Sequence, residues 1–99
     1  SLPEAQSILN SLTVVPALVY VLGQLRAQSP DERNENNSDT LWYKVLSKTL
    51  STKFDCDIES TQFDALNFME LAQKLVNDPL SDAFKFLVNS PTSSGGEDE

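Results

Sequence analysis

The sequence contains no histidine, which removes the side chain that serves most often as a general base and as a metal ligand. Its single cysteine, Cys56, can form neither an internal disulfide nor a Cys–His nucleophile pair, and a structural zinc site is excluded as well. Only three glycines occur, and the adjacent pair Gly95 and Gly96 lies near the C-terminal end, so no glycine-rich loop can hold a phosphate group. We therefore predict that the chain is not an enzyme and has no catalytic residues, no cofactor and no metal site.

Long apolar runs and an excess of positive charge are missing too. The longest apolar run, 14–22, is interrupted by Pro16 and is far shorter than the roughly 18 residues of a membrane span. Fifteen acidic residues against seven basic ones give a net charge of −8, which repels phosphate backbones and anionic membranes. We expect no nucleic acid, membrane or small-molecule substrate as a partner. The lone cysteine favours a reducing compartment, and hence an intracellular location in the cytoplasm or nucleus.

The negative charge is unevenly placed along the chain. Residues 1–28 carry one acid and one base, whereas residues 29–99 carry the whole net charge. An acidic surface of this kind suits a partner with a basic surface, although solubility alone is the simpler explanation of the same charge.

Helical periodicity dominates the chain, and the few glycines and prolines disfavour an all-β fold with its many turns. Helices are predicted over about 1–12, 16–28, 61–77 and 79–89, and a further one begins after a cap at Ser38 or Asp39. The predicted fold class is all-α, a compact bundle of about five short helices in one domain, 1–89, with a disordered acidic tail at 90–99. Residues 29–39 contain no apolar side chain and are predicted to form a polar loop within this domain. The first residue, Ser1, is typical of a piece of a longer protein.

Three residues are candidates for contact with a partner: Val19, Tyr20 and Tyr43. The predicted helix at 16–28 is apolar nearly all round, so it is either a central helix or one that meets another chain. Val19 and Tyr20 lie off its main apolar stripe. In the following helix Trp42 is predicted to anchor the core, which turns Tyr43 outward to where an interface can use it.

One cluster of acidic residues suggests an alternative function. Asp55, Asp57 and Glu59 alternate and are followed by Asp64, which resembles the ligand spacing of an EF-hand calcium loop at 55–66. The match is degenerate, because Ser60 stands where the loop needs glycine and Leu66 where it needs a bidentate glutamate. The simpler explanation is that the acids complement the dipole of the next helix.

The sequence thus leads to one main function hypothesis and one alternative. The main hypothesis is a non-catalytic protein–protein interaction module of a larger intracellular regulatory or scaffold protein. It would bind a partner helix or a basic surface, or self-associate through the helix at 16–28. The alternative is a calcium-responsive regulatory domain that uses the loop at 55–66.

Overall fold

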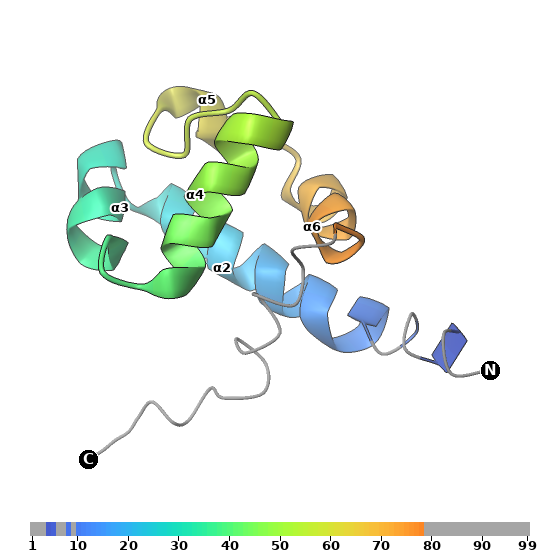
Figure 1. Cartoon of the computed structure of the whole chain (residues 1–99). Helices are drawn as coiled ribbons and strands as arrows, with labels where there is room; N and C mark the ends of the chain where they lie inside the picture. Colours follow the sequence, from blue (N-terminus) through green and yellow to red (C-terminus); the bar gives the residue numbers. More distant parts are fainter. Residues whose placement is uncertain (1–3, 6–7, 9, 79–99) are drawn as a thin grey trace, which may run out of the picture. The chain divides into compact units, whose positions relative to one another are not determined.

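Helices are the only regular secondary structure in the computed structural model, which describes residues 4–5, 8 and 10–78 (Figure 1). They are a π-helical turn, η1 (Asn10–Val14), and the α-helices α2 (Val15–Ala27), α3 (Pro30–Asn37), α4 (Leu41–Lys53), α5 (Thr61–Asp64) and α6 (Phe68–Val76). The predicted all-α fold class is confirmed. The helix predicted over 79–89 and the tail predicted over 90–99 lie outside the described residues. Within the described part, each helix is too short or too polar to cross a membrane.

The chain divides into two compact units, and each has its own buried side chains. The unit from Val21 to Phe68 buries apolar residues of α2, of α4, of α5 with the segment before it, and the first residue of α6. These residues are Leu22, Leu25, Tyr43, Leu46, Leu50, Cys56, Ile58, Phe63 and Phe68. The described residues of the other unit bury Val14, Val15, Leu18, Leu71, Ala72, Leu75 and Val76. Burying one such side chain contributes about 1.5–3 kcal/mol, and this burial is the main stabilising term of each unit.

The polar loop predicted at 29–39 is wrong, because this segment contains α3. Ser29 and Glu32 form a capping box: the Ser29 hydroxyl accepts from the Glu32 N–H, and Glu32 Oε1 accepts from the Ser29 N–H at 2.8 Å. Pro30 occupies the first helical turn, where its missing N–H is no loss. The helix has no apolar stripe and buries Arg33 instead, which a search for apolar periodicity does not detect.

The single helix predicted over 61–77 is wrong as well, because α5 and α6 are separate helices. Beyond α5 the N–H of Leu66 bonds the carbonyl of Phe63 at 3.2 Å, three residues back rather than four. Such a bond tightens the last turn and ends the α-helix. The side chains of α5 can therefore face in a direction that one continuous helix would not allow.

Candidate functional site

Tyr20 and Val19 lie on α2, and the structure separates the two. The Tyr20 side chain is 67% exposed, whereas Val19 is half-buried. The exposure of Tyr20 agrees with its predicted position off the buried stripe of the helix. Whether either residue contacts a partner stays a prediction.

Tyr20 is the end of a row of exposed apolar residues. Leu12, 70% exposed, and the exposed Pro16 precede it at intervals of four residues, and Ile8 continues the same spacing. We call Leu12, Pro16 and Tyr20 the apolar row. All three belong to the same unit and lie on η1 and the start of α2. Residues four apart lie nearly above one another on a helix, so the row forms one continuous strip of surface.

The apolar row begins in an unusual piece of backbone. Leu12 stands in the middle of η1, the π-helical turn that precedes α2. π-helical turns are rare and occur frequently at functional sites. The exposed leucine and the π-helical turn therefore coincide at one position.

Tyr43 does not face outward, so this part of the sequence prediction is wrong. Its side chain is only 3% exposed, and its hydroxyl donates to Glu59 Oε2 at 2.8 Å. Trp42 is the half-buried one of the two, with its ring edge-on to that of Tyr43 at 5.9 Å between centroids. Tyr43 shares a helical stripe with Leu46 and Leu50, which are fully buried. Tyr43 therefore belongs to the buried side chains of the unit from Val21 to Phe68 and not to its exposed surface.

The environment of Tyr43 predicts a loss of stability in alkaline solution. Burial, and then the bond to Glu59, raise the pKa of Tyr43 well above its ordinary value. A raised pKa in the folded state contributes stability that is complete below the unfolded pKa of about 10 and is lost as the pH rises above it. We expect the free energy of unfolding of the wild type to fall steeply above that pH. In Tyr43→Phe the part of the decline that comes from ionisation of the Tyr43 hydroxyl disappears, although the variant has a lower free energy of unfolding than the wild type at neutral pH.

Urea unfolding measured between neutral and strongly alkaline pH checks this expectation. Tyr20→Phe is the matched control, because the Tyr20 hydroxyl lies on an exposed ring and its removal should leave the alkaline decline unchanged. An equally steep decline in Tyr43→Phe and in the wild type would show that Tyr43 does not cause the loss of stability.

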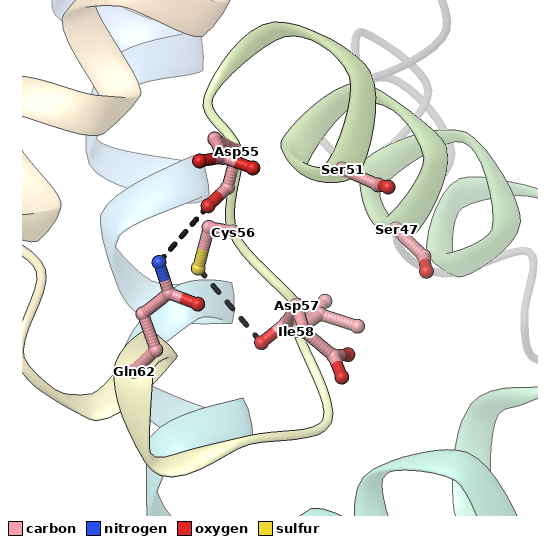
Figure 2. A pocket seen from close by; sticks show the side chains of 7 residues that line it. All are labelled: Ser47, Ser51, Asp55, Cys56, Asp57, Ile58 and Gln62. Atoms are coloured by element: carbon pink, nitrogen blue, oxygen red, sulfur yellow. Dashed lines mark hydrogen bonds between the residues drawn. The ribbon is translucent and has the colours of Figure 1, made fainter.

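The segment before α5 borders a cavity of about 380 Å³ (Figure 2). The Gln62 amide donates to the carbonyl of Asp55 at 2.9 Å and so fixes this segment. Cys56 is 3% exposed, and burial, with the nearby carboxylates of Asp57 and Asp55, raises the pKa of its thiol. A thiol with a raised pKa stays protonated at neutral pH and is a weak nucleophile. The cavity therefore offers packing space and hydrogen-bonding groups rather than an activated nucleophile.

The carboxylates of the 55–66 loop do not converge on one point. Glu59 accepts from Tyr43 and, at 2.9 Å, from the Asn34 amide, while Asp64 pairs with Arg33. Asp57 Oδ1 accepts from the backbone N–H of Glu59. Among the residues that the structure describes, no group of three or more potential ligands could hold a metal ion. The loop geometry thus gives the calcium hypothesis no support.

Arg33 is the most connected side chain that sequence reasoning missed. It is 0% exposed on α3, and its donors reach the carbonyls of Leu25, Ile58 and Ser60 at 2.7, 2.9 and 3.2 Å and the Asp64 carboxylate. These partners lie in α2, in the segment before α5 and in α5. The planar guanidinium suits such a task because its five donors point in fixed directions. Arg33 therefore joins three segments of one unit and has a structural role.

Comparison of the chain with protein-family models, with curated proteins and with solved structures gives no match.

Proposed function

We propose that this chain is a non-catalytic protein-interaction module of a larger intracellular protein, and that it binds a partner helix through the apolar row. The observation that carries the proposal is the alignment of Leu12, Pro16 and Tyr20 on one exposed strip. Single exposed apolar residues are ordinary on protein surfaces. Several exposed apolar residues in one continuous strip are less common, and such patches frequently mark interaction sites.

The shape of the row favours a helical partner. Helix-mediated recognition places apolar anchors one or two helical turns apart on one face, and the residues of the apolar row follow one another at intervals of four residues. Tyr20 adds a large rigid ring with a polar tip, the kind of side chain that is enriched at interfaces and among energetically dominant contacts. Val19, half-buried beside it, would contribute to the edge of the same contact.

The side-chain chemistry of the unit from Val21 to Phe68 supports a non-catalytic role. The buried thiol of Cys56 is held in its protonated form, and the acidic side chains of Glu59 and Asp64 are already engaged by donors of the chain itself. These groups stabilise the fold, and a partner surface has to be sought elsewhere on the chain.

The test is the substitution Tyr20→Asp. Because the ring is largely exposed, we expect the melting temperature to stay close to that of the wild type. A charge at the centre of a desolvated contact should weaken partner capture from a cell lysate about tenfold or more. Thermal melts and quantitative capture with the wild type and the variant provide the measurement.

Leu41→Asp is the matched control for this experiment. Leu41 is 68% exposed at the start of α4, so the substitution removes an equally exposed apolar side chain from the unit that does not contain the apolar row. Partner capture by Leu41→Asp should equal that by the wild type. If Tyr20→Asp captures the same proteins as the wild type does, the apolar row is not the binding surface.

A further inference from the structure

The helix α4 concentrates basic residues in a strongly acidic chain. It carries Lys44, Lys48 and Lys53, three of the seven basic residues, and none of the fifteen acidic ones. Lys44 and Lys48 are exposed and lie four residues apart, an arrangement in which two like charges destabilise a helix slightly. Every residue three or four positions from either lysine is uncharged or is the other lysine, so α4 itself offers the pair no carboxylate.

A hollow of about 440 Å³ lies beside this pair of lysines, and both of them line it together with Asn34 and Glu59. Ser47 and Ser51 of α4 line it as well, and these two serines also line the cavity of Figure 2, so the two hollows adjoin. Within the part of the chain that the structure describes, neither lysine forms an ion pair with a carboxylate. The hollow therefore holds two positive charges that the described residues leave unpaired.

Glu59 is the one acidic residue among the described residues that line this hollow, and donors of the chain already engage it. Its Oε2 accepts from the Tyr43 hydroxyl at 2.8 Å and from the Asn34 amide at 2.9 Å. These two donors offset part of the charge of Glu59. Charges farther away than the Debye length of about 8 Å are largely screened at physiological ionic strength, so the adjacent lysines weigh most in the potential inside the hollow.

We propose that this hollow binds a phosphorylated serine or threonine of a partner protein, whose phosphate pairs with Lys44 and Lys48. A phosphate monoester carries a charge of about −1.5 to −2 at pH 7 and three acceptor oxygens, so it matches two lysines with hydroxyl donors beside them better than a single carboxylate does. A nucleic acid would bring a row of phosphates, which the net charge of −8 repels. The adjoining cavity gives the peptide on one side of the phosphate a place to lie.

This inference goes beyond the proposed function and does not depend on it. The hollow belongs to the unit from Val21 to Phe68, whereas the apolar row belongs to the other unit. A partner can therefore use either surface without the other.

Nuclear magnetic resonance titration of the full chain tests the proposal. The probe is a short synthetic peptide, blocked at both ends, with one phosphoserine among glycines and alanines, and its unphosphorylated form and inorganic phosphate are the comparison ligands. We expect the phosphopeptide to shift the backbone amide resonances of α4 saturably at about 0.1–1 mM, because lysines bind phosphate as exposed point charges. The unphosphorylated peptide should cause no shift. Lowering the pH from about 7.5 to about 5 should weaken binding about threefold or more, because the phosphate loses its second charge near pH 6.

The double variant Lys44→Gln with Lys48→Gln should keep the melting temperature of the wild type, because both side chains are exposed, and should bind the phosphopeptide about tenfold more weakly or less. Lys74→Gln is the matched control, since Lys74 is an exposed lysine of the other unit, and it should bind as the wild type does. No saturable shift with the phosphopeptide, or equal binding by the double variant, overturns the proposal. If inorganic phosphate binds as tightly as the phosphopeptide, the hollow takes free phosphate and the phosphorylated partner is wrong.

Discussion

Substituting Arg33 by alanine should destabilise the unit from Val21 to Phe68 by about 3–5 kcal/mol, because it removes a fully buried guanidinium that bonds three backbone carbonyls and the Asp64 carboxylate. The Asp64 side chain is 40% exposed and can regain water, which reduces its share of this cost. The larger share comes from the carbonyls that lose a donor and from the space that the side chain leaves. Because domains of this size are stable by only about 5–15 kcal/mol, the variant should be close to unfolding at body temperature.

Urea unfolding followed by the fluorescence of Trp42 measures this loss, since the only tryptophan lies in the same unit. Arg33→Met keeps much of the side-chain volume, so its difference from Arg33→Ala isolates the packing contribution. Arg26→Ala is the matched control: Arg26 is exposed and lies 4.6 Å from the Phe68 ring centroid, a contact that contributes about 1 kcal/mol or less. Equal losses for the two alanine variants would show that the bonds of Arg33 contribute little.

One helix that sequence analysis predicted well has an apolar stripe. The helix predicted at 16–28 corresponds to α2, whose Leu18, Leu22 and Leu25 are buried at intervals of four and three residues. α3 was missed because its single buried side chain is an arginine, although Ser29 and Glu32 already had the spacing of a capping box. That local signal could have identified the helix without any knowledge of packing.

The roles of Arg33 and Tyr43 depend on residues far away in the sequence. The partners of Arg33 are 8, 25, 27 and 31 residues away, and Glu59 is sixteen residues from Tyr43. Periodicity describes only neighbours on one helix, so it could not tell which of Trp42 and Tyr43 finds a buried hydrogen-bond partner. The exposure of Tyr20, by contrast, depends on its position on α2 relative to the buried stripe, which periodicity does describe.

Phe63→Ala should cost about 3–5 kcal/mol, as for other fully buried aromatic residues. Phe63 is 0% exposed, its ring centroid lies 5.0 Å from that of Phe68, and the Arg33 guanidinium lies 4.8 Å from its centroid. It is the only buried residue of α5, a helix of four residues that is too short to be stable by itself. Its removal should release α5 from the rest of the unit, and Asp64 with it.

Because Asp64 is also a partner of Arg33, the two substitutions should not be additive. Once Phe63→Ala has loosened α5, Arg33→Met has fewer bonds left to break, and the double variant should lose about 1–2 kcal/mol less than the sum of the single losses. Urea unfolding of the four chains of this cycle gives the coupling free energy. Phe54→Ala is the matched control, since Phe54 is a half-buried phenylalanine at the end of α4, and its cycle with Arg33→Met should be additive within about 0.5 kcal/mol. Additivity in both cycles would mean that α5 keeps its place without Phe63, and that Arg33 and Phe63 stabilise the unit independently.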